Sequence, residues 1–345
     1  MTRQISVGGV PIGGGAPVTI QSMTNTRTDD VEATLHQIRT LAAAGCEIIR
    51  VAVPDMAAAQ AVGKIKEGSP IPVVVDIHFD YKLALEAIAA GADKVRINPG
   101  NIGGADHVKA VAQACAQRRV PIRIGVNGGS LEKPLLAKYG GVCPEAMVES
   151  AFGHIRLLNQ FDFDDICVSL KSSRVPMTMK AYQLMSMQSN YPLHIGVTEA
   201  GTVRMGTLKS AVGLGGLLAL GIGDTMRVSL SADPVEEVYA AREILKAAGI
   251  RKEGAELVSC PTCGRTRIDL IALANEVEER LKGVDKPITV AVMGCVVNGP
   301  GEASAADCGI AGGVGEGLLF KKGEIVKKVP QEQLVDELFA LIDTL

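Results

Sequence analysis

One pattern repeats eight times between Val18 and about Leu230, and it constrains the fold of this chain more than any other feature. Each repeat is a short β-branched run that ends in polar or glycine residues, followed by a longer Ala- and Leu-rich segment of helical character. Eight strands that alternate with helices predict a closed parallel barrel of the TIM-like (β/α)8 type, because a six-stranded open sheet would leave two repeats unexplained. The runs cover residues 18–24, 47–53, 72–79, 94–98, 122–127, 166–171, 193–199 and 226–230.

The segments around these runs support the same fold class. Helical segments such as 31–44, 82–90, 145–160 and 207–220 lie between runs, and several close with glycine, which is common at the C-terminus of a helix. The chain is 47% hydrophobic but only 3% aromatic, as expected for an aliphatic α/β core. Ahead of the first run, apolar residues alternate around Gly8-Gly9, and this predicts a hairpin that caps the bottom of the barrel.

The pattern changes after a helical stretch that ends near Ala248. Beyond it we expect a strand at 287–293, a hairpin at 317–329 around Lys322-Gly323 and a final amphipathic helix at 331–345. We therefore expect two domains, a barrel over residues 1–245 and a smaller α+β domain over residues 246–345.

Charge and composition exclude several function classes. The formal net charge is −3, from 35 basic and 38 acidic residues, and no long run of one sign indicates binding to nucleic acid or to a membrane surface. Residues 1–15 lack the apolar region of a secretory signal, and the longest apolar stretch, 211–223, is too short and glycine-rich to span a bilayer. We expect a cytoplasmic protein whose eight cysteines are reduced thiols or metal ligands.

Polar residues near the ends of the runs would face the mouth of a barrel, where such proteins bind their substrates. Members of a pair two or four residues apart point the same way on a strand. The candidates are Arg50, Asp76 with His78, Arg96 with Asn98, Arg123 with Asn127, Ser169 with Lys171, and Arg227 with Ser229. Leaving a cation unpaired in an apolar strand costs several kcal/mol, so this set predicts an anion site, most simply for a phosphate or diphosphate.

An alternative is that these cations form structural ion pairs with Asp76, Glu199 and other carboxylates. Asp76 and Glu199 are also candidate acid and base groups, on the third and seventh strands. The sequence contains neither a Gly-x-x-x-x-Gly-Lys loop nor a Gly-x-Gly-x-x-Gly fingerprint, so it indicates neither a nucleoside triphosphate nor a dinucleotide.

Three cysteines of the second domain form the more specific motif. Cys260 and Cys263 bring two thiolates within reach of one metal, and Cys295, at the end of the predicted strand, supplies a third. Soft thiolates select zinc or an iron–sulfur cluster. From spacing alone, a zinc site with Cys308 as the fourth ligand stays open.

These motifs resemble a known enzyme family. The segments 260–266 (CPTCGRT) and 293–302 (MGCVVNGPGE) are similar to those of the bacterial 4-hydroxy-3-methylbut-2-en-1-yl diphosphate synthases. Further likeness lies at 18–24 (VTIQSMT), 75–79 (VDIHF), 96–101 (RINPGN), 123–127 (RIGVN) and 197–201 (VTEAG), so it extends over nearly the whole chain.

The resemblance implies a specific chemistry. It implies a [4Fe–4S] cluster held by Cys260, Cys263, Cys295 and Glu302, and a two-electron reduction that opens and dehydrates 2-C-methyl-D-erythritol 2,4-cyclodiphosphate. It also implies a flavodoxin or ferredoxin as electron donor, a homodimer in which the cluster domain of one chain covers the barrel of the other, and no organic cofactor. In this interpretation the residues at the strand ends hold the diphosphate, and Asp76 or Glu199 handles protons.

Two other functions compete with this one. A zinc-ribbon module could be attached to a barrel hydrolase or aldolase for a phosphorylated sugar, in which case the protein would be colourless and contain zinc. A pterin-binding barrel could also bind a diphosphate, and it would leave the cysteine domain without a role.

Overall fold

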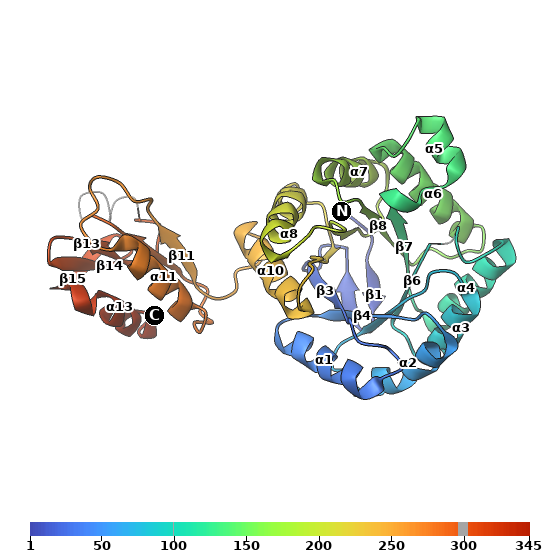
Figure 1. The fold of residues 1–345 in the computed structure, drawn as a ribbon, viewed down its shortest axis with the longest axis horizontal. Helices are drawn as coiled ribbons and strands as arrows, with labels where there is room; N and C mark the ends of the chain where they lie inside the picture. The colour runs from blue at the N-terminus through green and yellow to red at the C-terminus, as the bar shows by residue number, and fades with distance from the viewer. Residues whose placement is uncertain (99, 296–302) are drawn as a thin grey trace. The chain divides into compact units, whose positions relative to one another are not determined.

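The computed structural model of the chain describes residues 1–98, 100–295 and 303–345. They divide into two compact units, Met1–Ile250 and Arg251–Leu345, which are described separately below and drawn in Figure 1.

The first unit contains a parallel barrel. The hydrogen-bonded order of its strands is β8-β7-β6-β5-β4-β3-β10-β9, and a parallel bridge between Val168 and Leu193 brings its two ends together. This arrangement confirms the predicted (β/α)8 class. The strands are β3 (Thr19–Met23), β4 (Ile48–Ala52), β5 (Val73–Asp76), β6 (Lys94–Ile97), β7 (Ile122–Asn127), β8 (Ile166–Lys171), β9 (His194–Ile195) and β10 (Thr225–Met226).

Helices surround the barrel, as Figure 1 shows. Several begin at an aspartate whose side chain accepts a hydrogen bond from a backbone N–H of the first turn, as Asp55 does from Ala58, and this satisfies a donor that the helix leaves unpaired. The helices are α1 (Val31–Ala43), α2 (Met56–Gly68), α3 (Tyr81–Ala89), α4 (Ala105–Arg118), α5 (Lys133–Tyr139), α6 (Pro144–Asn159), α7 (Val175–Gln188), α8 (Val203–Ser210), α9 (Gly216–Ala219) and α10 (Pro234–Ala247), with a short 3-10 turn η1 (Gly128–Ser130) after β7.

The predicted N-terminal hairpin is confirmed. Strands β1 (Ile5–Val7) and β2 (Val10–Ile12) pair in antiparallel fashion, and their apolar side chains pack with Ile48, Val74 and Cys167 of the barrel. Because these barrel residues lie near the N-terminal ends of their strands, the hairpin closes the face opposite the mouth.

Two predicted elements are shorter than expected. The run at 193–199 contains two strand residues, His194 and Ile195, and the run at 226–230 contains one, Met226. After β9 the chain leaves the extended conformation at Glu199 and Gly201, whose φ angles are 52° and 113°. The helix expected at 207–220 is divided into α8, a π-helical turn η2 (Ala211–Gly215) and α9. Glycines at positions 213, 215 and 216 lower the preference for a regular α-helix there.

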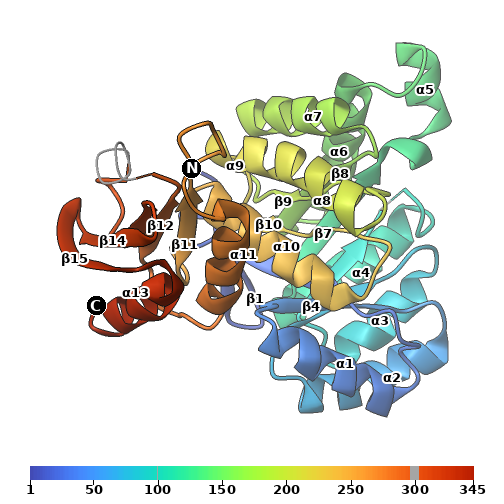
Figure 2. The same cartoon turned by 60° about the vertical axis from the view of Figure 1, so that its left-hand side comes forward.

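The second unit has a five-stranded mixed sheet in the order β11-β12-β13-β14-β15. The hairpin at Lys322-Gly323 and the C-terminal helix are confirmed, whereas β11, β13 and α11 were not predicted. The two strands are short and border cysteines, but α11 has 12 residues with buried Leu270, Val277 and Leu281 at helical spacing, so its pattern was available in the sequence. The elements are β11 (Glu256–Ser259), α11 (Leu270–Leu281), β12 (Thr289–Met293), β13 (Cys308–Gly312), β14 (Glu316–Lys321), β15 (Glu324–Pro330), η3 (Gln331–Gln333) and α13 (Leu334–Asp343), and Figure 2 shows them from a second side.

Among the described residues, the longest apolar helices fall short of the length and hydropathy that crossing a bilayer requires.

Candidate functional site

A buried ion network occupies the mouth of the barrel. Arg96 donates from Nη1 to Asp76 Oδ1 at 2.9 Å, and Arg50 Nε lies 3.7 Å from Asp76 Oδ2. The carboxylate is 4% exposed, and the two guanidinium groups and His78 outweigh its burial and hold its pKa well below the usual range. Asp76 is therefore ionised across the physiological pH range and fixes Arg50 and Arg96 in place.

A second carboxylate at the mouth comes from outside the barrel strands. Glu237, buried on α10, accepts hydrogen bonds at 3.2 Å from Nε and Nη2 of Arg227. It also accepts from the Ser22 hydroxyl at 3.3 Å and from the backbone N–H of Leu230 at 3.0 Å. Glu237 thus sets the direction in which Arg227 points.

Two buried cations of the mouth have no carboxylate partner in the described part of the chain. Arg123 is 1% exposed and reaches only the side-chain oxygen of Gln21, at 3.4 Å from its Nη1. Burial lowers the pKa of Lys171 well below its usual value, and the charges of Arg123 and Arg50 lower it further. An anion at the mouth would pair with Arg123 and would raise the pKa of Lys171, because it supplies the missing opposite charge.

Glycines make room for these long side chains. A Cβ atom on Gly125 would lie 2.4 Å from Nε of Arg96, and one on Gly196 would lie 2.4 Å from Nζ of Lys171. Both contacts are too short for any side chain, so glycine at these inward positions lets the cations extend across the mouth.

The other predicted binding residues differ in burial. His78 is exposed and lies 3.6 Å from Asp76, whereas Asn98 is buried and its Oδ1 accepts from the backbone N–H of Gly100 at 3.0 Å. Asn127 ends β7 and Ser229 follows β10, and both are half-buried. Ser169 is buried and donates to the Ile124 carbonyl.

Glu199 takes no part in the ion network. It is exposed, and its φ of 52° lies in the left-handed region, which non-glycine residues seldom adopt. The ion pairs that the alternative expects are present at Asp76, whereas Glu199 forms none with the described cations of the mouth. Of the five cations, Arg50, Arg96 and Arg227 are paired with a carboxylate, and Arg123 and Lys171 have none among residues 1–98, 100–295 and 303–345.

Sequence reasoning missed three residues of this site. Glu237 lies on a helix, and nothing in its local sequence marks it as a partner of Arg227. Gln21 and Met23 lie on β3, and the Met23 sulfur is 2.8 Å from Nη2 of Arg50. Side chains alternate between the two faces of a strand, so the sequence at 19–23 places Gln21 and Met23 on the same face as Thr19. This alternation could have identified both residues.

The cysteine motif lies at one edge of the sheet of the second unit. Cys260 follows β11 and Cys295 follows β12, and these strands are parallel neighbours. The backbone N–H of Gly294 donates to Cys260 Sγ at 3.2 Å, and that of Cys263 donates to Thr266 Oγ1 at 3.2 Å. Hydrogen bonds from Arg265 lower the pKa of the exposed Cys263 thiol, which favours the thiolate that binds metals.

Cys308 is at the opposite edge of this sheet. It is paired in register with Val290, five residues before Cys295 along β12, which corresponds to about 16 Å at the rise of a strand. The thiol is buried in the core, and burial raises its pKa to about 11. This position argues against Cys308 as a ligand alongside Cys260 and Cys295.

The described side chains do not form a closed metal site. Where the structure describes the chain, no three His, Cys, Asp or Glu side chains are grouped so that they could hold one metal ion. Glu302 lies outside the described residues. The residues nevertheless suit a thiolate-bound group, because Cys260 and Cys295 follow neighbouring parallel strands at the same sheet edge and the pKa of Cys263 is lowered.

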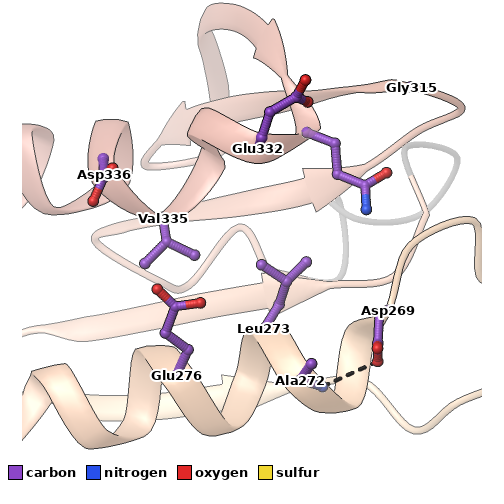
Figure 3. Close-up of a pocket in the computed structure, with 9 residues that line it drawn as sticks. Asp269, Ala272, Leu273, Glu276, Gly315, Glu332, Val335 and Asp336 are labelled. Carbon is purple, nitrogen blue, oxygen red and sulfur yellow. Dashed lines mark hydrogen bonds between the residues drawn. The ribbon is translucent and has the colours of Figure 1, made fainter.

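A surface pocket of about 530 Å³ lies between α11 and the segment around η3 and α13, as Figure 3 shows. Four carboxylates contribute to its lining, from Asp269, Glu276, Glu332 and Asp336. Asp269 caps α11 through the N–H of Ala272, and Arg280 pairs with Asp336 at 2.8 Å. An acidic lining does not suit a phosphate, so this pocket is not the predicted anion site.

Fold and mouth together define the class of this protein as a (β/α)8 barrel with a buried cationic site and an additional thiol-bearing unit. Residues 2–242 match the family model described as the GcpE TIM-barrel domain, and residues 256–344 match that of the GcpE protein C-terminal domain. The chain belongs to the GcpE family.

Curated relatives match the chain along its full length. A protein of Geobacter sulfurreducens is 63% identical over 342 residues, which cover 99% of this chain and 97% of the relative. One of Clostridium acetobutylicum is 59% identical, with 100% and 99% covered. Both are named 4-hydroxy-3-methylbut-2-en-1-yl diphosphate synthase (flavodoxin), which confirms the resemblance seen in the motifs.

Two of the similar solved structures share the fold over about three quarters of this chain. An N-acetylneuraminic acid synthetase of Leptospira borgpetersenii has a TM-score of 0.53 at 14% identity, covering 72% of this chain and 90% of that one. The dihydropteroate synthase of Yersinia pestis has a TM-score of 0.50 at 14% identity, covering 73% and 100%. At this identity the likeness shows the fold and does not support a pterin site.

Proposed function

We propose that this chain opens, dehydrates and reduces 2-C-methyl-D-erythritol 2,4-cyclodiphosphate to 4-hydroxy-3-methylbut-2-enyl diphosphate, a step of isoprenoid precursor biosynthesis in the methylerythritol phosphate pathway. The observation that carries the proposal is the barrel mouth, where Arg123 and Lys171 are buried and no described carboxylate pairs with them. The full-length match to relatives named for this product indicates which anion the mouth binds.

The mouth binds the diphosphate through its cations. In this proposal Arg123 and Lys171 contact phosphate oxygens directly, because no described carboxylate competes for them. Arg50, Arg96 and Arg227 are already oriented by Asp76 and Glu237, so binding does not require them to be ordered first. The remaining binding residues of the proposal, which supply uncharged hydrogen bonds or border the mouth, are His78, Asn98, Asn127 and Ser229.

The two candidate proton-handling residues have different roles in this proposal. Asp76 stays ionised, because its pKa is held low by Arg50, His78 and Arg96, so it positions guanidinium groups and does not donate a proton. Glu199 is exposed and takes no part in that network, and its left-handed φ angle of 52° sets the direction in which its side chain leaves the backbone. Glu199 is therefore the residue that we assign to proton transfer.

The second unit is proposed to bind a [4Fe–4S] cluster through Cys260, Cys263, Cys295 and Glu302. When bound, such a cluster supplies single electrons and an iron atom that can act as a Lewis acid. The chain contributes thiolates, of which Cys263 ionises most readily among the described thiols with a shifted pKa. A carboxylate ligand at Glu302 would hold its iron less strongly than a thiolate and so leave that position exchangeable.

The proposal also includes a cytoplasmic location, a homodimer and a flavodoxin or ferredoxin as electron donor. The relatives' names specify flavodoxin. If the barrel of one chain works with the cluster unit of its partner, mixing Arg123→Ala chains with Cys295→Ser chains restores turnover, since each hybrid contains one intact pair. If both units of a site belong to one chain, the mixture stays inactive.

The reaction itself is tested by anaerobic incubation of the full-length chain with the cyclic diphosphate, a flavodoxin and a reductant for it. Phosphorus NMR distinguishes the cyclic substrate from a linear diphosphate, whose terminal and inner phosphorus atoms differ. We expect a linear product only when reductant is present. A colourless protein that contains stoichiometric zinc and forms no linear product would support the zinc-ribbon alternative instead.

A further inference from the structure

A second group of buried polar atoms lies inside the barrel and includes one nitrogen of the mouth residue Arg123. Nζ of Lys94, Nε of Arg123, Nε2 of Gln21 and Nε2 of His194 are buried without a hydrogen-bond partner among the described residues. The four side chains are at most 1% exposed. They come from β6, β7, β3 and β9, at inward positions of the barrel strands.

Lys94 lies deeper in the barrel than Arg96, which is on the same strand. It is paired in register with Val74, which packs on the N-terminal hairpin at the base of the barrel. Arg96 follows two residues later on the same face of β6, about 6–7 Å nearer the mouth. The diphosphate proposed above therefore contacts Arg96, with Lys94 beneath it.

These groups are close enough to influence one another. Burial lowers the pKa of Lys94 to about 8, the nearby Cys167 thiol opposes this shift, and Arg123 and Arg50 reinforce it. Gln21 is joined to Arg123 by the hydrogen bond to its side-chain oxygen, which leaves its NH₂ group as a donor. Lys94 Nζ, Arg123 Nε and Gln21 Nε2 are thus neighbouring donors that no described acceptor satisfies.

The charges inside the barrel do not balance. Six cations, from Arg50, Lys94, Arg96, Arg123, Lys171 and Arg227, face two carboxylates, Asp76 and Glu237, in the described part of the chain. Each phosphorus of the cyclic diphosphate keeps one ionised oxygen, so the substrate compensates part of this excess. Asp224, near the base, is engaged by Leu193 N–H and the Thr2 hydroxyl.

We propose that the barrel interior binds a small inorganic anion of halide size through Lys94 Nζ, Arg123 Nε and Gln21 Nε2, separately from the diphosphate at the mouth. Water would satisfy the hydrogen bonds but not the excess charge, and an uncompensated buried ammonium group costs several kcal/mol. His194 is a further donor when the Thr225 hydroxyl, 3.4 Å from its Nδ1, donates to that nitrogen. The inference does not rest on the proposed reaction, since any substrate at the mouth would leave Lys94 below it.

Bromide is the probe, because its anomalous scattering identifies it. Crystals of the anaerobically purified full-length chain grown in bromide should give an anomalous peak within hydrogen-bonding distance of Lys94 Nζ. A water molecule without anomalous signal at that place, or peaks confined to the mouth and surface, would overturn the proposal.

Solution measurements decide whether binding occurs only at crystal concentration. Bromide replaces gluconate at constant ionic strength, and thermal melting is followed for wild type, Lys94→Met and the exposed control Lys109→Met. We expect the Tm of wild type and control to rise by about 2–3 °C per tenfold increase in bromide above the Kd, and that of Lys94→Met to stay constant. An equal response in Lys94→Met would place the anion at the mouth and overturn the proposal.

Should Lys94→Met fail to fold, Lys94→Gln serves the same comparison, and the crystallographic result on wild type decides without any variant.

Discussion

The barrel mouth and the cysteine edge of the second unit arrange their functional groups in opposite ways. At the mouth, Arg50, Asp76 and Arg96 are buried and already joined to one another before any ligand binds. At the sheet edge, Cys260 and Cys295 are half-buried and Cys263 is exposed. Under the proposed function, the difference teaches that the protein alone organises its anion site, whereas the thiols would gain a fixed arrangement from the cluster.

The largest effect should come from removing a thiol. Cys295→Ser is expected to lower turnover more than about 100-fold and to abolish the iron content, because loss of one ligand releases the whole group. The matched control is Cys143→Ser, since the Cys143 side chain only caps α6 by accepting from Ala146 N–H, and serine serves that position well. Iron analysis and anaerobic turnover measure both, and a Cys295→Ser protein with normal iron would remove this thiol from the ligand set.

At the mouth, the expected effect is on affinity and not on iron content. Arg123→Ala removes a buried cation that has no carboxylate partner, so the Kd for the cyclic diphosphate should rise by about 30- to 1,000-fold. The exposed Arg39→Ala is the control. Calorimetry under nitrogen measures the Kd, and an unchanged value in Arg123→Ala would move the anion site elsewhere.

A substitution of Glu302 tests the proposal that this carboxylate is an exchangeable ligand at the cysteine edge. Glu302→Ala should retain the three thiolates and much of the iron while it loses turnover by about 10- to 100-fold. Glu324→Ala, an exposed position of the hairpin, is the control. Full activity of Glu302→Ala would contradict a role as ligand.

The ion network predicts a pH-dependent change in stability. Asp76→Asn leaves Arg50 and Arg96 without their carboxylate and should lower the free energy of unfolding at pH 7 by about 3–5 kcal/mol. Because the pKa of folded Asp76 is depressed, its contribution is present above the unfolded pKa of about 4 and is lost as the pH falls below it.

The gap in the free energy of unfolding between wild type and Asp76→Asn should therefore be smaller in acid than at pH 7. Denaturant unfolding of both proteins and of the exposed control Asp106→Asn, at pH 7 and at pH 3, measures this. A gap that stays constant or widens in acid would mean that Asp76 is not held ionised by the arginines.

The smallest effect concerns thiol reactivity in the absence of iron. Iodoacetamide should label Cys263 first, because its pKa is lowered and it is exposed, while burial raises the pKa of Cys46 to about 12 and of Cys308 to about 11. Peptide mass spectrometry follows the labelling. Equal rates of labelling for Cys263 and Cys308 would contradict the difference in exposure and pKa between the two thiols.

Sequence periodicity was sufficient to predict the barrel and most of its mouth. Arg123 and Lys171 were found because strand residues alternate between faces, so polar residues in otherwise apolar runs point inward together. The hairpin at the base was predictable for the same reason. The cysteine spacing, in contrast, left Cys308 open as a ligand, because spacing along the chain does not show at which end of a parallel sheet a residue lies.

The rest of the site depends on tertiary contacts. Glu237 reaches Arg227 only because α10 packs beside β3, and a helical glutamate carries no local sign of such a partner. Lys94 opens its strand, where a lysine is more often at the surface, and only the closed barrel shows that it is fully buried. The backbone angle of Glu199 likewise follows from how the chain leaves β9.

The central claim is that the cationic mouth and the cysteine edge serve one reaction. Electron paramagnetic resonance of the dithionite-reduced, anaerobically purified chain, recorded with and without the cyclic diphosphate, tests it most directly. The account predicts a reduced cluster signal that changes when the diphosphate is added and that keeps its original form in Arg123→Ala at the same concentration. A signal that does not change when the diphosphate is added at concentrations that saturate binding, or no iron signal at all, would contradict the account.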